Sequence, residues 1–396
     1  MVIVKLLRVA IAGSSLVTVS SAFAQAQDAA AVDPVLAHFR EFRAALDRGD
    51  TAAAEEAAQA AYDASLAVNG PRTAVLAQNL ATLRLDLGKP SAAYGPAQKA
   101  HELATADDDS GVDPLLAALT LGRAALAVDG LRTAANLRAA LAQAERRGEL
   151  QAEAYAGAVD LARTAFSVKE YETAREAWAA SGRLAAGAPS EPEFARGLAR
   201  TGEGAAIFMQ AIADGGGSNE DDAGTAIVEI ARGPARDANA AFTEALGFLQ
   251  PFAEGGDPGV LTLAQGVYAQ ALAWQGALRA KLQSQGDEPP RGERGSSGTP
   301  SGAGARCAVR LVAEPPPAYP SEALAGSGVG AVVMRVTTDA QGAIVDRQIA
   351  AAVPTGSFSQ SVAAVASQWR VELAPDAAPG CRRDGTQYTP ILFVAE

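Results

Sequence analysis

Residues 330–350 read GAVVMRVTTDAQGAIVDRQIA, and this stretch decides how the C-terminal part of the chain folds. Over 331–338 the residues alternate between two faces, with Val332, Met334 and Val336 on one and Val333, Arg335 and Thr337 on the other, as a half-buried strand requires. Residues 343–350 predict a second strand through Ile344, Val345 and Ile349. Between the two runs, Asp339 and Gly342 bound a four-residue turn. The stretch therefore predicts a β-hairpin. Its first strand is expected to turn inward Val332, Met334 and Val336.

The residues on either side of this hairpin predict two helices and a last strand. Upstream, the proline-rich segment 315–320 is a rigid extended entry, and residues 321–325 have the composition of a short helix. Downstream, hydrophobic residues recur at three- and four-residue steps over 358–369, which predicts a helix. Residues 388–394 predict a closing strand, and Pro390 favours an edge position for it or a strand start.

This order of elements resembles the C-terminal domain of the TonB family, whose members are periplasmic modules that bind outer-membrane receptors. The resemblance spans residues 306–396, roughly the last fifth of the chain, and implies a small α+β domain with an antiparallel sheet and two helices. An unrelated α+β domain with the same layout is the alternative. The residues that carry the resemblance are Tyr319, Pro320, Gly330, Gly342 and Trp369, the last at the end of the second helix.

The resemblance also implies a mode of recognition, because the family binds an extended receptor peptide by adding it to the edge of its sheet. The closing strand is the expected edge. Family members that transduce energy carry an uncleaved N-terminal membrane helix with a histidine and a long proline-rich spacer, whereas this chain has no histidine in its first 30 residues. The residues that we expect to contact a partner are Tyr388, Ile391, Phe393 and Arg370.

The first 24 residues have the pattern of a secretory signal peptide. Lys5 and Arg8 supply positive charge, residues 9–19 form an apolar centre, and Ala22 and Ala24 form a small-x-small cleavage site. A retained membrane anchor is the alternative, but several small polar residues interrupt the apolar centre, and it is short for a spanning helix.

Composition and motifs exclude several classes of function. The chain has 396 residues, 48% of them hydrophobic, which is enough for two or three domains with a buried core. A formal charge of −12 argues against nucleic acid or an anionic lipid surface as a general partner. The two histidines, His38 and His101, have no neighbouring cysteine or paired acids, and the glycine-rich segment 326–330 lacks the lysine of a phosphate loop. We therefore expect no enzyme activity, metal or cofactor.

Both cysteines, Cys307 and Cys381, lie in the C-terminal domain. In an exported protein this number favours a disulfide, which would stabilise a small core by about 3–5 kcal/mol. Two unpaired buried thiols are the alternative.

The body of the chain, residues 32–282, is rich in alanine and leucine and predicts an all-α region. Alanine trios with steps of four and three begin at positions 54, 93 and 135, and the pattern recurs more loosely as Ala174, Trp178 and Ser181. Gly49, Gly88 and Gly130 precede the first three trios by five residues, and Lys169 precedes the fourth. This pattern resembles a tetratricopeptide-like solenoid with repeats longer than the usual ~34 residues. A plain helical bundle is the alternative.

Residues 283–305 are rich in glycine, serine, proline and charge, which predicts a flexible linker between the helical region and the C-terminal domain. The multidomain chain has two candidate functions. One is a periplasmic adaptor, whose C-terminal sheet binds an outer-membrane receptor or another envelope protein while its repeats hold a second protein. The other is a membrane-anchored energy transducer of the TonB type.

The N-terminus of the mature protein separates these two functions. We expect Edman sequencing of the chain purified from a periplasmic extract to begin near Gln25, because the signal peptide is removed on export. A chain that still carries residues 1–24 and fractionates with membranes would favour the transducer.

Overall fold

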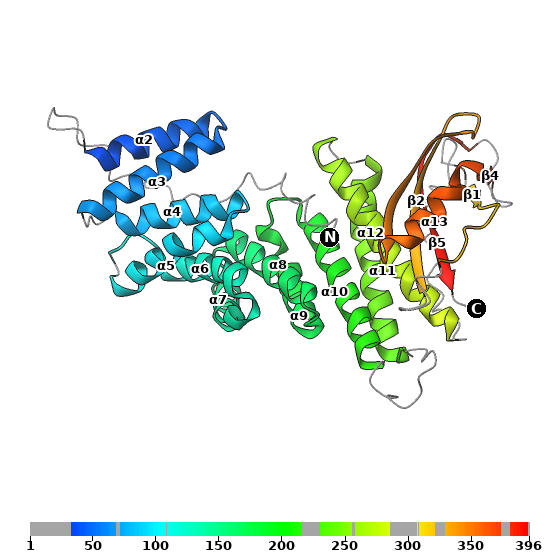
Figure 1. The fold of residues 1–396 in the computed structure, drawn as a ribbon, viewed down its shortest axis with the longest axis horizontal. Coiled ribbons are helices and arrows are strands. Elements are labelled where there is room, and N and C mark those ends of the chain that lie inside the picture. Colours follow the sequence, from blue (N-terminus) through cyan, green and yellow to red (C-terminus); the bar gives the residue numbers. More distant parts are fainter. Residues whose placement is uncertain are drawn as a thin grey trace. The chain divides into compact units, whose positions relative to one another are not determined.

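The computed structural model describes residues 33–68, 72–107, 109–215, 230–255, 258–285, 307, 309–320, 329–373 and 381–394 (Figure 1). These residues form two compact units, 1–195 and 196–396, called here the N-terminal and C-terminal units. The predicted signal peptide, nearly all of the predicted linker and the predicted helix at 321–325 lie outside the described residues.

The N-terminal unit is a succession of helices, each packed on the next and reversed by a short connection (Figure 1). This arrangement agrees with the predicted helical region. The helices are α2 (Pro34–Asp47), α3 (Thr51–Val68), α4 (Thr73–Asp86), α5 (Pro90–Ala106), α6 (Pro114–Asp129), α7 (Ala134–Arg147), α8 (Gln151–Ser167) and α9 (Tyr171–Arg183).

Three of the reversals have the same backbone geometry. Gly49, Gly88 and Lys169 adopt φ values of 70°, 67° and 66°, and the N–H of the next residue donates to the carbonyl five residues earlier in each case. This is the left-handed ending that glycine favours at a helix C-terminus. Lys169 therefore occupies a glycine position, which explains why it stands at the same place in the sequence pattern.

The prediction that the third trio lies on the buried face of its helix is wrong. Ala135, Ala139 and Ala142 are exposed, whereas the other three trios are buried. A 3-10 turn, η2 (Gly130–Thr133), lies between α6 and α7 and shifts the buried face of α7. The residues of α7 that are buried with the same four- and three-residue steps are Leu137, Leu141 and Ala144.

Helix α6 lies in a long apolar stretch of the described residues. By length and composition, residues Pro114–Arg147 could cross a membrane, with a mean hydropathy of 1.4 in one window of which 50% is buried. That stretch comprises two helices and η2, and α6 alone has 16 residues, fewer than the ~20 that span a bilayer. Because α6 packs between α5 and α8, its composition is that of a core helix.

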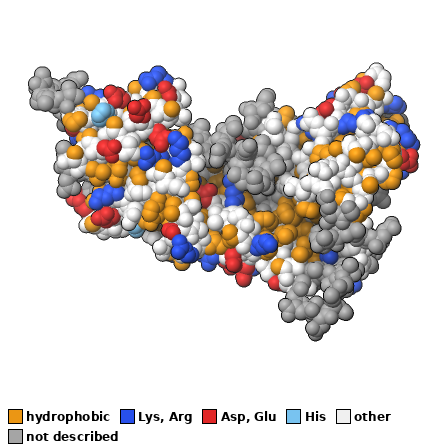
Figure 2. All heavy atoms as spheres, viewed as in Figure 1, with side chains coloured by type: hydrophobic (Ala, Val, Ile, Leu, Met, Phe, Trp, Pro, Cys, Tyr) orange, Lys and Arg blue, Asp and Glu red, His pale blue; other side chains and the backbone are white. Residues whose placement is uncertain are grey.

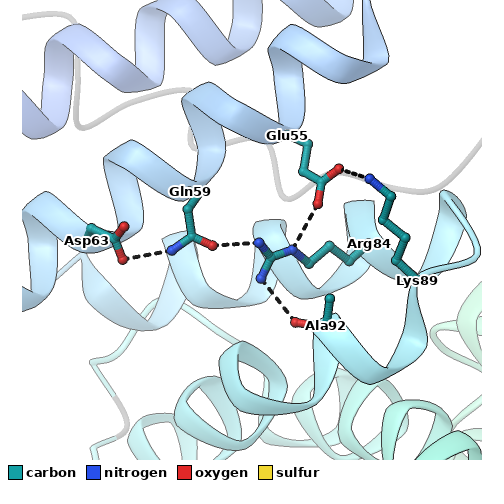
Figure 3. Close-up of polar contacts among 6 residues, drawn as sticks. All are labelled: Glu55, Gln59, Asp63, Arg84, Lys89 and Ala92. Atoms are coloured by element: carbon teal, nitrogen blue, oxygen red, sulfur yellow. Dashed lines mark hydrogen bonds and ion pairs between the residues drawn. The ribbon is translucent and has the colours of Figure 1, made fainter.

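A polar network joins the first helix pair to the second (Figure 3). Arg84 on α4 donates to Glu55 and Gln59 on α3, at 3.2 and 2.6 Å, and to the carbonyl of Ala92 on α5 at 3.0 Å. Lys89, just before α5, donates to the other oxygen of Glu55. The carboxylate of Glu55 is only 17% exposed, so it depends on both cations. Acidic and basic side chains are interspersed over the face of this unit seen in Figure 2.

The network predicts an acid-sensitive contribution to stability. The hydrogen bond from Lys89, supported by Arg84, holds the pKa of Glu55 below its ordinary 4.5 although burial opposes this shift. A lowered carboxyl pKa stabilises the fold above the unfolded value, and the contribution is lost as the pH falls through the folded value. We expect Glu55→Gln to lower the free energy of unfolding by about 1–2 kcal/mol at neutral pH, and by much less at about pH 2–3.

Urea unfolding of both proteins at the two pH values measures this difference. The exposed neighbour Glu56, substituted in the same way, is the matched control and should change little at either pH. An equal effect of Glu55→Gln at both pH values would contradict the assignment.

The C-terminal unit combines three long helices with two small sheets. The helices are α10 (Pro192–Gly215), whose first four residues precede the unit, α11 (Arg232–Gly255) and α12 (Pro258–Ser284). The larger sheet has the order β3-β2-β5, with antiparallel neighbours, and contains β2 (Val329–Thr338), β3 (Ile344–Val353) and β5 (Gly385–Val394). The smaller sheet pairs β1 (Val309–Val312) with β4 (Arg370–Leu373).

The predicted hairpin is present as β2 and β3, but the expectation of a half-buried first strand is wrong. Val332, Met334 and Val336 pack in a core with helix α13 (Ser357–Val365), as the alternation predicts. Val333 on the opposite face is also fully buried. Helix α12 packs across β2, β3 and β5 on that second face, and so turns β2 into a central, two-sided strand.

The second predicted helix ends earlier than its hydrophobic period indicates. Helix α13 stops at Val365 and a 3-10 turn, η5 (Ala366–Gln368), follows it. Trp369 is extended and Arg370 begins β4, because this segment pairs with β1. Trp369 is nevertheless buried in the same core, so the hydrophobic period correctly identifies the inward side chains.

Candidate binding edge of the C-terminal sheet

Strand β5 lies at one edge of the three-stranded sheet. It pairs with β2 in continuous register from Val329 opposite Val394 to Thr338 opposite Gly385. Among the described residues, no second strand pairs with β5. The outer side of β5 therefore presents backbone groups that another strand could bind.

Two positions determine which backbone groups of β5 point outward. Pro390 has no N–H, so it fits a position where the strand turns that group away from β2. The hydroxyls of Thr337 and Thr386, which lie opposite each other, are 3.0 Å apart. Such close side chains are typical of pairs that exchange no backbone hydrogen bonds. Since pair types alternate, the backbone also points outward at Tyr388, Leu392 and Val394.

The opposite edge of the sheet is less suited to a partner strand. The pairing of β3 with β2 shifts register twice, which leaves Val345 and Ala350 without partners on β2. These bulges break the regular spacing of the backbone groups on β3. Arg347 of β3 also donates to the carbonyls of Ser367 and Trp369, so its side chain is held by the domain itself. The regular edge is therefore β5.

The side chains of β5 alternate between the two faces of the sheet. Phe393 is only 4% exposed and packs against Phe358 with ring centroids 4.7 Å apart, and Ile391 lies against the same core. Tyr388 faces the other way and contacts Tyr268 of α12 at 5.5 Å between ring centroids. Three of the four residues expected to contact a partner thus lie on the edge strand, with side chains packed inside the domain.

Arg370, the fourth of these residues, lies elsewhere. It is exposed on β4 of the smaller sheet, where it forms ion pairs with Glu372 at 3.0 Å and Glu314 at 3.6 Å. Arg370 follows the buried Trp369 directly in the sequence. It nevertheless belongs to the smaller sheet, because the chain leaves α13 before this position and Arg370 pairs with Val312 of β1.

The two glycines of the predicted fold motif have distinct physical roles. Gly342 closes the hairpin turn at a φ of 85°, and its N–H donates to the carbonyl of Asp339 at 2.9 Å. The Asp339 carboxylate accepts from the N–H of Ala343 at 2.8 Å and thereby fixes the turn. Gly330 lets β2 approach α13, because a Cβ there would lie 2.7 Å from the ring of Phe358.

The proline-rich entry is fastened to the core by two aromatic residues. The ring of Tyr319 packs edge-on against Phe358 and Phe393, and half-buried Pro320 follows it. The indole N–H of Trp369 donates to the carbonyl of Pro315 at 2.8 Å. These contacts give Tyr319 and Trp369, two of the residues that carry the family resemblance, a structural role in holding the entry segment on the core.

Cys307 and Cys381 form a disulfide, as the sequence predicts. The N–H of Cys307 also donates to the carbonyl of Arg382 at 2.8 Å. The bond links the start of β1 to the approach to β5 over a separation of 74 residues. A loop of this length corresponds to about 4 kcal/mol of stabilisation. The disulfide therefore anchors the beginning of the edge strand.

Helix α12 covers the face of the sheet opposite α13 with small and polar contacts. A Cβ at Gly276 would lie 2.7 Å from Ala331 on β2 and 3.1 Å from Leu392 on β5, so the helix touches both strands. Arg335 on β2 donates to Gln265 of α12 at 3.4 Å and to Asp346 of β3 at 3.1 Å. Burial raises the pKa of Tyr268 to about 12, which reflects how closely this interface is packed.

The packing of α12 on the sheet was not predicted from the sequence. The helix is apolar on most of its surface and its residues are largely buried, which is the composition of a helix covered on several sides. That composition predicts a buried helix, but it does not identify the sheet as one of the covering elements. The short strands β1 and β4 were also missed, since their pairing joins residues more than 50 positions apart.

The close approach at Gly276 gives a direct test of this packing. We expect Gly276→Ala to lower the free energy of unfolding by about 1–3 kcal/mol, because the added methyl group clashes with Ala331. At Gly247 on α11 an added methyl group would meet nothing within 4 Å, so Gly247→Ala should be neutral or stabilising. Thermal and urea unfolding of both variants measure the difference. A neutral Gly276→Ala would contradict the packing of α12 on the sheet.

Comparison with known proteins agrees with the resemblance seen in the sequence. Residues 315–394 match the family model for the C-terminal domain of Gram-negative bacterial TonB proteins. No curated protein matched the chain. The family is a non-enzymatic energy-transducer domain of the cell envelope that interacts with outer-membrane receptors. The matched residues include β2, β3, α13, β4 and β5, whereas α12 lies outside them. Residues 315–394 are therefore a TonB C-terminal domain.

Proposed function

We propose that this chain is a non-enzymatic periplasmic protein that binds an outer-membrane receptor, or another envelope protein, by strand addition to β5. The observation that carries this proposal is the continuous edge of β5, whose outward backbone groups are not paired with a strand of the described residues. Backbone hydrogen bonds supply affinity in this mode of binding, and they require little side-chain identity.

In this proposal the candidate partner-binding residues have different roles. Tyr388 offers its outward N–H and C=O, while its ring is held against α12. Ile391 and Phe393 direct their side chains into the core, so they hold the edge strand in position. Arg370 is available only to a partner that also reaches the smaller sheet.

The helical region fits a second role as a protein-interaction scaffold. We propose that its helix pairs are tetratricopeptide-like repeats that hold another protein. The supporting observations are the shared turn geometry at Gly49, Gly88 and Lys169 and the recurring buried trios of α3, α5, α7 and α9. Stacked helix pairs bury a continuous core and leave extended surfaces for partners.

The periplasm is the compartment that fits both regions. A disulfide between Cys307 and Cys381 persists in an oxidising compartment, and the matched family belongs to the cell envelope. The predicted signal peptide supplies the export route.

Removal of one outward N–H tests strand addition. Leu392→Pro deletes a donor on the outer edge of β5 while leaving the bonds to β2 intact, and Leu392→Ala removes the side chain but keeps the N–H. With the full chain as bait for detergent-solubilised outer-membrane proteins, we expect Leu392→Pro to weaken capture about tenfold relative to Leu392→Ala. Quantitative mass spectrometry of the captured proteins provides the measurement.

A positional control shows whether the edge geometry is correct. Ile391→Pro removes a hydrogen bond between β5 and β2, so it should lower the unfolding temperature much more than Leu392→Pro does. Capture of the same proteins in the same amounts by Leu392→Pro and Leu392→Ala would refute strand addition at this edge.

A further inference from the structure

The N-terminal unit has an open groove between helices α7 and α9, both of which pack on α8. The groove encloses about 120 Å³, and all three helices contribute to its apolar floor. The residues of the floor are Leu141, Ala142, Leu161, Ala177 and Ala180. Two polar contacts bridge the groove from α7 to α9. Arg138 donates to Thr173 at 2.8 Å, and Arg183 donates to Glu145 at 3.0 Å.

A side chain of the protein itself fills the corresponding gap between α3 and α5. Arg84 on α4 reaches both helices, where it donates to side chains of α3 and to a main-chain carbonyl of α5 (Figure 3). In α8 the corresponding residue is Ala165, because the two helices end in the same way. The N–H of Lys89 donates to the carbonyl of Arg84, and the N–H of Glu170 donates to the carbonyl of Ala165. An alanine cannot span such a gap, so the groove stays open.

One charged side chain at the mouth of the groove lacks a partner. Glu176 on α9 lines the groove, is exposed, and forms no hydrogen bond or ion pair with another described residue. The other carboxylate of the groove, Glu145, already accepts from Arg183. A basic group of a bound molecule would therefore find an available carboxylate at Glu176, next to an apolar floor.

The size of the groove fits one aliphatic side chain. An apolar cavity of about 150 Å³ binds benzene, so this groove has room for a branched aliphatic side chain such as that of leucine or isoleucine. Ala142 on the rim is exposed, which makes the floor accessible from solvent. Filling the groove would remove apolar surface from water on both molecules, and this burial favours binding.

We propose that the α7–α9 groove is a docking site for a second protein, an inference that rests on the proposed scaffold role of the helical region. The bound segment inserts one aliphatic side chain between Ala142 and Ala177 and places a lysine or arginine beside Glu176. The inserted side chain fills the gap that Arg84 fills between α3 and α5. The site thus defines the chemistry of the protein that the helical region holds.

Peptides selected on the full chain are the probe for this site. Short peptides are selected from a random phage-displayed library on the immobilised protein and are resynthesised with a photoreactive group, so that mass spectrometry locates their crosslinks. The affinity of those that crosslink to α7 or α9 is measured by fluorescence anisotropy. We expect replacement of one aliphatic residue by alanine to weaken the binding of each such peptide about tenfold or more.

Two pairs of variants locate the contacts. Ala142→Phe blocks the mouth of the groove and should weaken binding about tenfold or more. Ala139→Phe is its control, because Ala139 is exposed on the same helix but does not line the groove. Glu176→Lys should also weaken binding, and replacement of the basic peptide residue by glutamate should restore it. Glu172→Lys, at an exposed position of α9 outside the groove, is the control for charge.

The outcomes separate this inference from the scaffold role. Peptides that crosslink elsewhere on the helical region and bind Ala142→Phe normally overturn the groove and leave the scaffold role standing. A selection in which no peptide crosslinks to the helical region counts against both. Groove peptides that need neither an aliphatic residue nor Glu176 overturn the assigned chemistry. A dimer that Ala142→Phe dissociates in analytical ultracentrifugation would replace the second protein by a second copy of this chain. Weaker binding by Ala142→Phe and Glu176→Lys, with both controls unchanged, supports the site.

Discussion

The burial of β2 on both faces is the constraint on which the C-terminal unit depends. Val332 faces the core under α13 and Val333 faces α12, and neither is exposed to solvent. A three-stranded sheet with one covering helix would leave half of this strand in water. Helix α12 therefore supplies hydrophobic burial that the described residues of the matched range 315–394 do not provide on this face.

This constraint also decides where a partner can bind. With α12 and α13 on its faces, the sheet can be extended only at its edges. Bulges at Val345 and Ala350 interrupt the backbone spacing of β3, and Arg347 is engaged by the end of the α13 segment. Strand β5 has neither feature, and the disulfide at Cys381 anchors its approach. The edge that keeps a regular register is the one that suits strand addition.

Local patterns in the sequence predicted the local parts of this structure. Asp339 and Gly342 predicted the hairpin turn because their conformations depend on neighbouring residues only. The position of Lys169 marked a helix reversal even without a glycine. The same approach failed for Ala135, since the inserted turn η2 rotates the following helix and periodicity does not record such a shift.

The parts that escaped prediction depend on contacts between distant segments. The pairing of β1 with β4 and the packing of α12 on the sheet both join segments that are far apart in the sequence. The local sequence of one segment does not indicate which other segment it will contact. The edge position of β5 could be predicted from the sequence, because Pro390 lacks an N–H and is therefore disfavoured in the central strand of a sheet. The direction of each β5 side chain, which separates Tyr388 from Phe393, required the register with β2.

Amide hydrogen exchange of β5, measured by nuclear magnetic resonance on the full chain, tests the central claim most directly. The register predicts slow exchange at Thr389, Ile391 and Phe393, whose N–H groups point to β2, and fast exchange at Tyr388, Leu392 and Val394. A bound strand should then slow the second set. Uniform protection of all six amides in the free protein would contradict an open edge at β5.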